Sequence, residues 1–135
     1  MRIRIIRQKK PAGKDLDQEL EWLCSSLGFC EEIDKDRTAA AIFKKLLENT
    51  RAGEPLRSDD IAEDVGKSRG AVVNHLNKLI NAGLVVRHGT TYELREQTLR
   101  NTMMEMRRDM MRMMEDMEAI ADEIDRELET RRRRI

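Results

Sequence analysis

At residues 68–85 the chain carries SRGAVVNHLNKLINAGLV, a pattern that predicts one helix followed by a strand. Ser68 is a favourable residue at a helix N-terminus, and Gly83 is favourable just beyond a helix C-terminus. Between them, apolar residues recur at the three- and four-residue spacing that places side chains on one helix face. These residues are Val72, Leu76, Leu79 and Ile80. We therefore expect a helix over residues 68–82 with one buried face.

A shorter helix precedes this segment, and a hairpin follows it. Leu56 is expected to be a buried anchor before the short helix, which Ser58 is expected to cap and Gly66 to end. Downstream, a three-residue connection centred on Gly89 has the glycine that a tight hairpin turn needs. Its two strands are expected at residues 84–87 and 91–94. This order is that of a winged helix-turn-helix in which residues 84–94 form the wing.

The run at residues 68–85 resembles the heart of the ArsR and MarR families of regulators. The spacing carries the resemblance: serine at the cap, valine four residues later, histidine-leucine three and four beyond that, leucine three further on, then Ala-Gly-Leu-Val before the wing. The likeness covers about residues 37–95. It implies a domain that binds double-stranded DNA as a dimer and regulates transcription, as a repressor. His75 matches a histidine that recurs in these families, which implies a structural role.

The outward face of the expected helix carries the candidate DNA-reading residues. A major groove admits one helix, so the face opposite the apolar one would meet base edges. Asn74 or Asn77 suits adenine, and the methyl groups of Val73 suit the methyl group of thymine. Arg69 suits guanine or a phosphate. With phosphate contacts at the helix start and in the wing, the expected DNA-binding residues are Lys67, Ser68, Arg69, Gly70, Val73, Asn74, Asn77, Lys78, Arg87, His88 and Thr90.

The residues before the resemblance fall into two blocks of opposite charge. Residues 1–14 hold six basic and no acidic side chains, and they are expected to form a basic arm or a short strand. Residues 15–36 hold eight acidic side chains against one basic, and we expect an amphipathic helix ended by Gly28 and then an acidic connector. Asp36 is expected to cap the next helix, which should end near Asn49. A polyanion would be attracted to the arm and repelled by the acidic block.

From residue 96 to residue 135 the chain predicts a long helix with a basic tail. Its apolar residues alternate in steps of four and three, the heptad pattern of a coiled coil. The seam residues are Leu99, Met103, Met106, Met110, Met113, Met117, Ile120 and Ile124. The same helix of a second subunit is the simplest cover for this seam, so we expect a homodimer. Because Met104, Met111 and Met114 widen the apolar face, the first helix is expected to pack there as well.

The expected fold is mainly α with a small β-hairpin wing. It consists of a winged helix-turn-helix and a long C-terminal coiled-coil dimerisation helix. The four expected segments are the arm at 1–14, the first helix and connector at 15–36, the DNA-binding domain at 37–95 and the methionine-rich helix at 96–135.

Methionine and cysteine offer alternatives to plain packing. Seven methionines lie within residues 103–114, and thioethers suit copper(I), but the heptad spacing already explains these side chains. Cys24 and Cys30 form a redox-sensing pair in one interpretation, yet Cys24 lies on the apolar stripe of the first helix, which favours a buried structural thiol. Metal-sensing ArsR regulators carry paired cysteines near the recognition domain, and this chain has none there. We expect no metal and no cofactor; a small hydrophobic effector in a methionine-lined groove stays open.

Composition and the absence of certain motifs weigh against several other functional classes of protein. The 135 residues are 39% charged and 3% aromatic, and no glycine-rich phosphate loop or nucleophile with a visible base partner occurs, so no enzyme is expected. No stretch is long and apolar enough to span a membrane, and the first ten residues lack the apolar core of a signal peptide, which predicts a cytoplasmic protein. A sequence-specific regulator is the favoured interpretation. The alternatives are a low-specificity nucleoid-associated DNA-binding protein and a winged-helix adaptor that docks another protein.

Overall fold

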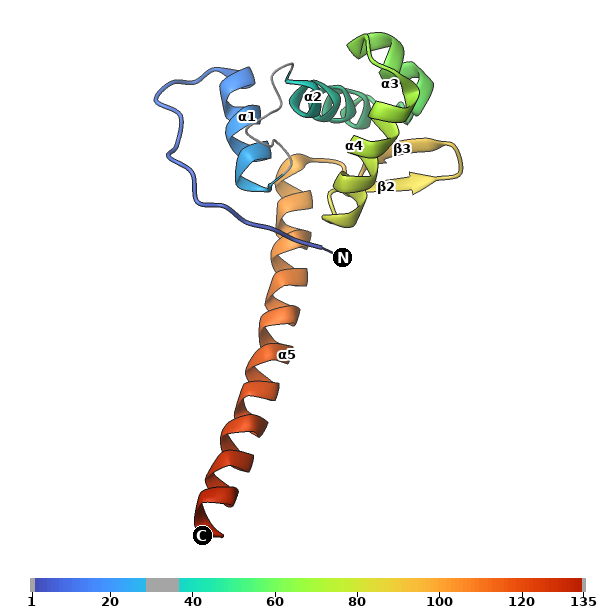
Figure 1. Ribbon diagram of the computed structural model, residues 1–135. Helices are drawn as coiled ribbons and strands as arrows, with labels where there is room; N and C mark the ends of the chain where they lie inside the picture. The colour runs from blue at the N-terminus through green and yellow to red at the C-terminus, as the bar shows by residue number, and fades with distance from the viewer. Residues whose placement is uncertain (1, 29–36, 135) are drawn as a thin grey trace. The chain divides into compact units, whose positions relative to one another are not determined.

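The computed structural model describes residues 2–28 and 37–134 and divides into two units, Met1–Thr102 and Met103–Ile135. The elements, in chain order, are α1 (Leu16–Ser26), α2 (Thr38–Arg51), β1 (Leu56–Arg57), α3 (Ser58–Val65), α4 (Arg69–Asn81), β2 (Val85–His88), β3 (Thr91–Leu94) and α5 (Leu99–Arg133) (Figure 1). The predicted class, mainly α with a small β wing and a long C-terminal helix, is confirmed. In the described part of the chain, no helix has both the length and the apolar character of a membrane span.

The core of the first unit lies between α2, α3, α4 and the sheet. α2 is the central helix, because it contacts α1, α3, α4 and β3. The most deeply buried large side chains of this core are Ile42, Phe43, Leu46, Ile61, Val72, Leu76 and Leu84. Burying one such side chain completely stabilises a fold by about 1.5–3 kcal/mol. The apolar face predicted for residues 68–82 is therefore the face that holds α4 in place.

Local signals end the helices much as expected. The hydroxyl of Ser68 accepts a hydrogen bond from the N–H of Ala71 at 3.2 Å, which caps α4. Gly66 ends α3 with φ 66°, a left-handed conformation that glycine adopts without steric cost. The expected cap at Ser58 is shifted by one residue: Arg57 is the cap, and its N–H donates to Asp60 Oδ2 at 3.3 Å.

The sheet has one strand more than the sequence predicted. β1 contains only two residues and pairs antiparallel with β3, giving the strand order β1-β3-β2. Two residues are too few to show the alternation that identifies a strand, although the expected burial of Leu56 is observed. β2 ends at His88, so the wing turn is Gly89-Thr90, with φ 63° at the glycine.

α2 is longer than predicted, and its last turn holds the wing. The helix continues to Arg51 rather than ending near Asn49. This extension places Thr50 in the core, where its hydroxyl accepts a buried hydrogen bond from the N–H of Leu94 at 3.0 Å. The wing is thereby anchored to a residue 44 positions earlier in the chain.

In its described residues, 2–14, the N-terminal segment is an arm without a strand. The N–H of Arg2 donates to the carbonyl of Asn81 at 2.5 Å, and the N–H of Ile6 donates to the carbonyl of Ser26 at 2.8 Å. α1 begins after Asp15, whose carboxylate accepts from the N–H of Asp17 at 3.1 Å. The helix buries Cys24, as expected. The acidic connector, with Cys30 and Asp36, lies outside the described residues.

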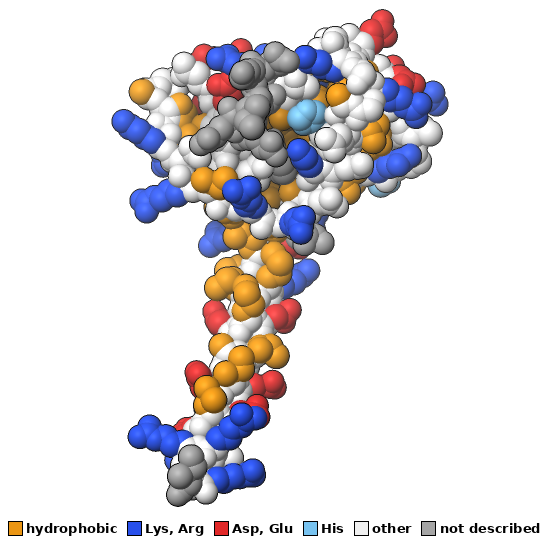
Figure 2. All heavy atoms as spheres, in the orientation of Figure 1, with side chains coloured by type: hydrophobic (Ala, Val, Ile, Leu, Met, Phe, Trp, Pro, Cys, Tyr) orange, Lys and Arg blue, Asp and Glu red, His pale blue; other side chains and the backbone are white. Residues whose placement is uncertain are grey.

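α5 supplies the second unit, Met103–Ile135. The helix begins at Leu99 rather than at residue 96, and the hydroxyl of Thr98 caps it by accepting from the N–H of Asn101 at 3.1 Å. The last four of its eight heptad side chains face solvent, where apolar side chains form a stripe along the helix (Figure 2). The exposed large apolar residues of α5 are Met104, Met111, Met113, Met114, Met117, Ile120, Ile124 and Leu128.

Candidate nucleic-acid interface

α4 presents most of the predicted reading residues on one exposed face. Gly70, Asn74, Asn77 and Lys78 are exposed, and Val73 is half-buried. A Cβ atom built on Gly70 would meet nothing within 4 Å, so the backbone is open to an approaching ligand there. The face is polar and unobstructed by the rest of the first unit, as a groove-reading helix requires.

The predicted phosphate-contacting residues at the start of α4 differ in their exposure to solvent. Arg69 is exposed, but Lys67 is only half-exposed. The hydroxyl of Ser68 already accepts the capping hydrogen bond from the N–H of Ala71, so it has a structural role in the free protein. The cap leaves the helix N-terminus ordered, and backbone N–H groups at such a terminus favour an anion.

The wing holds its basic side chain firmly. Arg87 Nε donates to the carbonyl of Gly89 at 2.7 Å, and the guanidinium carbon lies 5.6 Å from the ring centre of Tyr92. His88 Nε2 lies 3.2 Å from Glu93 Oε1 across the two strands, so this histidine faces a carboxylate rather than open solvent alone. Thr90, at the turn, is exposed. Arg87 is consequently the best-positioned cation of the wing.

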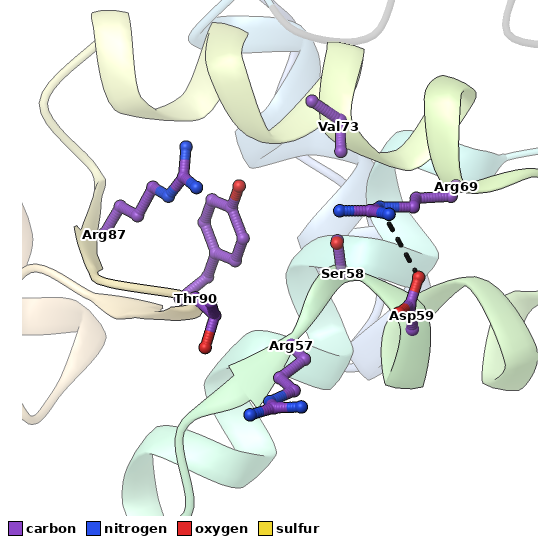
Figure 3. A pocket seen from close by; sticks show the side chains of 8 residues that line it. Arg57, Ser58, Asp59, Arg69, Val73, Arg87 and Thr90 are labelled. Carbon is purple, nitrogen blue, oxygen red and sulfur yellow. Dashed lines mark ion pairs between the residues drawn. The ribbon is translucent and has the colours of Figure 1, made fainter.

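A hollow of about 320 Å³ lies between α3, α4 and the wing (Figure 3). It is called the arginine hollow below. Its lining residues are Arg57, Ser58, Asp59, Arg69, Val73, Arg87, Thr90 and Tyr92. Arg69 and Val73 extend from α4 toward the start of α3, and Arg87 lies on the wing side (Figure 3). Residues of β1, α3, α4, the wing turn and its two strands therefore build one concave surface beside the exposed face of α4.

The arginine hollow carries an excess of positive charge. Three arginines line it against one carboxylate, Asp59. Arg69 Nε lies 3.5 Å from Asp59 Oδ1, with side chains 72% and 71% exposed. An ion pair this exposed is screened by water and contributes little to stability. The surface therefore suits an anion, because its arginines outnumber its one carboxylate.

Sequence reasoning identified four residues of the arginine hollow and missed the other four. Arg69, Val73, Arg87 and Thr90 were expected at the interface, whereas Ser58 was interpreted only as a helix cap, with Asp59 beside it in the same turn. Arg57 was missed because its position depends on β1, which the sequence does not reveal. Tyr92 carries one usable signal, since it is the only tyrosine of the chain and lies two residues before Leu94 on the same face of β3.

Residues 36–86 match the family model described as bacterial regulatory protein, arsR family. This segment is similar to the helix-turn-helix domain of that family. It spans α2, β1, α3, α4 and the beginning of β2, so the family match includes α4 and stops before β3. The match supports a DNA-binding transcription regulator. No curated protein and no solved structure matches the chain.

The described residues present no metal centre. In residues 2–28 and 37–134, no three histidine, cysteine, aspartate or glutamate side chains gather where they could hold a metal ion. The described cysteine, Cys24, is buried in α1 and lies outside the matched segment. The candidate interface consists of α4, the wing and the arginine hollow.

Proposed function

We propose that the chain is a dimeric transcriptional repressor that reads the major groove with α4 and contacts the DNA backbone with its wing. One observation carries the proposal: the exposed polar face of α4 lies beside a concave surface that holds three arginines. A nucleic acid offers both base edges and a row of phosphates to such a pair of surfaces. The ArsR-family match supports the same conclusion from sequence alone.

Base reading is assigned to the exposed side chains in the middle of α4. Asn74 and Asn77 are exposed, and each has the paired donor and acceptor that adenine requires. Arg69 can reach guanine or a phosphate, and Val73 offers methyl groups to thymine. The proposed DNA-contacting residues remain Lys67, Ser68, Arg69, Gly70, Val73, Asn74, Asn77, Lys78, Arg87, His88 and Thr90.

Dimerisation is assigned to the heptad seam of α5. Four seam side chains are 37–57% exposed in the single chain, namely Met113, Met117, Ile120 and Ile124. It is unfavourable to leave this much apolar surface in water. The proposed seam residues are Leu99, Met103, Met106, Met110, Met113, Met117, Ile120 and Ile124. Because Met106 is already buried, the residues from Met110 onward are those that a second copy can cover most fully.

Repression follows from occupancy alone. A dimer that covers two half-sites occupies DNA that a polymerase would otherwise use, and it needs no additional contact to block it. Two reading helices also double the number of base contacts, which gives the specificity that a single short helix lacks.

Selection of duplexes from a random pool by the full-length protein tests the proposal. We expect enrichment of a two-fold symmetric site, with binding that survives excess random DNA. Enrichment of no sequence despite tight binding would indicate the low-specificity alternative, and no binding at any salt concentration would favour the protein-docking alternative.

Two variants then assign the contacts within the selected site. Asn74→Ala should relax the preference at one base position by about 1–3 kcal/mol. Arg87→Gln serves as its control and should weaken binding to all duplexes alike, because a backbone contact carries no sequence information. Equal losses on every duplex from both variants would contradict the assignment of Asn74 to base reading.

A further inference from the structure

We propose that a groove between the N-terminal arm and α1 binds one small, uncharged, apolar molecule. The groove has a volume of about 480 Å³ and is lined by residues of the arm, by residues of α1 and by Leu99, the first residue of α5. It is called the arm groove below. The proposal goes beyond the proposed function, which assigns no ligand to the arm or to α1.

The walls of the arm groove are held together by hydrogen bonds between the arm and α1. The arm runs alongside α1 in the opposite direction (Figure 1). The N–H of Ile6 donates to the carbonyl of Ser26 at the end of the helix, at 2.8 Å, and Asp15 caps its start. Between these points, the indole N–H of Trp22 donates to the carbonyl of Gln8 at 3.4 Å. The groove is therefore formed before a ligand arrives, as most small-molecule sites are.

The lining of the arm groove is mostly apolar. Its apolar residues outside α5 are Pro11 of the arm and Leu16, Leu20, Trp22 and Leu23 of α1. Because its indole N–H already has a partner, Trp22 offers the groove mainly apolar ring surface. Leu16 is 57% exposed, and Leu23 is half-buried. An apolar molecule in the groove would remove this surface from water, which is favourable.

The charges of the arm groove balance, which favours an uncharged ligand. Lys10 and Glu19 line the groove with opposite signs, and both residues are exposed. A charged ligand of either sign would meet one like charge as well as one opposite charge. It would also lose hydration on entering an apolar lining. An uncharged molecule has neither cost.

A hollow on α5 suits such a molecule less well, although methionine lines it. Met104 and Met111 share this hollow of about 450 Å³ with three arginines and one glutamate. Arginine holds its hydration less tightly than lysine does, but three cations beside two methionines still make a charged surface. The apolar effector that the sequence left open for a methionine-lined groove is therefore better accommodated by the leucines and the tryptophan of the arm groove.

The size of the arm groove matches a small molecule better than a protein. Small-molecule sites have volumes of about 300–1,000 Å³. A stable protein interface uses about 20–30 residues on each side, whereas nine residues line this groove. Of these nine, only Leu99 belongs to the proposed seam of α5. Dimerisation through the seam therefore does not by itself require the groove.

Trp22 allows ligand binding to be measured directly, because it is the only tryptophan of the chain. The probe is N-phenyl-1-naphthylamine, an uncharged apolar dye that accepts excitation energy from tryptophan. Titrated into the full-length protein, the dye should quench Trp22 emission with a dissociation constant of roughly 10 µM and a stoichiometry of one dye per chain. The absence of saturable quenching would overturn the proposal.

Two exposed apolar residues provide a matched pair of variants. Leu16 is 57% exposed and lines the groove, whereas Ile5 is 56% exposed and does not line it. Leu16→Glu should weaken dye binding by about tenfold or more, because it places a charge against an apolar ligand. Ile5→Glu should change dye binding by less than about twofold. Thermal melts confirm that both variants are folded, and equal binding by the two would remove the groove as the site.

Two other occupancies are outcomes of the same titration. If Met117→Glu abolishes dye binding and Leu16→Glu does not, the dye lies on the exposed stripe of α5 and the proposal is wrong. If dye binding is lost as the protein concentration is raised through dimer formation, a second copy of the chain covers the groove and the small-molecule assignment is wrong.

The anionic dye 8-anilino-1-naphthalenesulfonate tests the class of ligand, because it has the same rings and one added sulfonate. The uncharged dye should bind about tenfold more tightly than the sulfonate. Tighter binding of the sulfonate, abolished by Lys10→Gln, would assign the groove to an anionic amphiphile and overturn the uncharged class.

These measurements use no DNA, so they separate the arm groove from the proposed function. Dye binding that follows Leu16, in a protein that selects no duplex, would support the groove and contradict the regulator assignment. Selection of a duplex by a protein that binds no dye would do the reverse.

Discussion

α4 and α5 carry apolar side chains at the same helical spacing, but their surroundings differ completely. In α4, Val72, Leu76 and Leu79 are at most 3% exposed, because α2, α3 and the sheet cover them. In α5, Met117, Ile120 and Ile124 are more than half exposed. Periodicity thus predicts a helix and the face that will be covered, but it does not say whether the same chain supplies the cover.

The two faces should therefore contribute to different equilibria. The apolar face of α4 stabilises the folding of a single chain, because its contacts lie within the first unit. The seam of α5 gains its free energy only when another surface removes it from water. Substitutions in the two helices should accordingly separate in folding and in association measurements.

The largest expected effect is on the stability of the folded single chain. Leu76→Ala should lower the free energy of unfolding by about 2–5 kcal/mol, because a fully buried side chain leaves a cavity. Met117→Ala, at an exposed position, should change the unfolding of the monomer by less than about 0.5 kcal/mol. Urea unfolding at concentrations below the dimer dissociation constant measures both. Similar losses from the two variants would show that α5 is already covered within one chain.

The next effect concerns association. Met113→Glu combined with Met117→Glu places four charges in a two-stranded seam, so the dimer should weaken by about a hundredfold or more. The double leucine variant at these positions keeps the seam apolar and should remain dimeric. Sedimentation equilibrium distinguishes the two, and a dimer that persists in the glutamate variant would remove α5 from the interface.

The smallest effect sharpens the contrast between the two faces of α4 itself. Gly70→Ala should stabilise the domain by about 0.5–1 kcal/mol, because alanine is the better helix former and a Cβ atom at this position meets nothing within 4 Å. The same methyl group lies on the proposed reading face, so affinity for the selected duplex should fall. A thermal melt tests the gain in stability, and a DNA titration of the same sample tests the loss of affinity. Unchanged affinity would mean that DNA does not approach the backbone at this residue.

The elements that local chemistry specifies were predictable from sequence. Ser68 and Gly66 marked helix ends, and the spacing of apolar residues identified the buried face of α4 before its neighbours were known. The wing was predicted because a glycine turn lies between two apolar strands. These signals depend on residues only a few positions apart.

The parts that were missed depend on residues far apart in the chain. β1 exists because β3 pairs with it, and the last turn of α2 is fixed by the hydrogen bond from Leu94 to Thr50. Arg57 joins the arginine hollow only through that pairing. No local pattern in residues 50–57 encodes a partner more than 30 positions downstream, so these features required the folded structure.

The order of the strands also determines when this domain becomes complete during synthesis. β3 is the last strand made and the middle strand of the sheet. A nascent chain that ends before Thr91 holds β1 and β2 without the strand that both must pair with, and Thr50 has no wing residue to bind. The arginine hollow, which needs all three strands, therefore forms only when the whole wing has left the ribosome. A truncated product keeps the reading helix but lacks the complete interface.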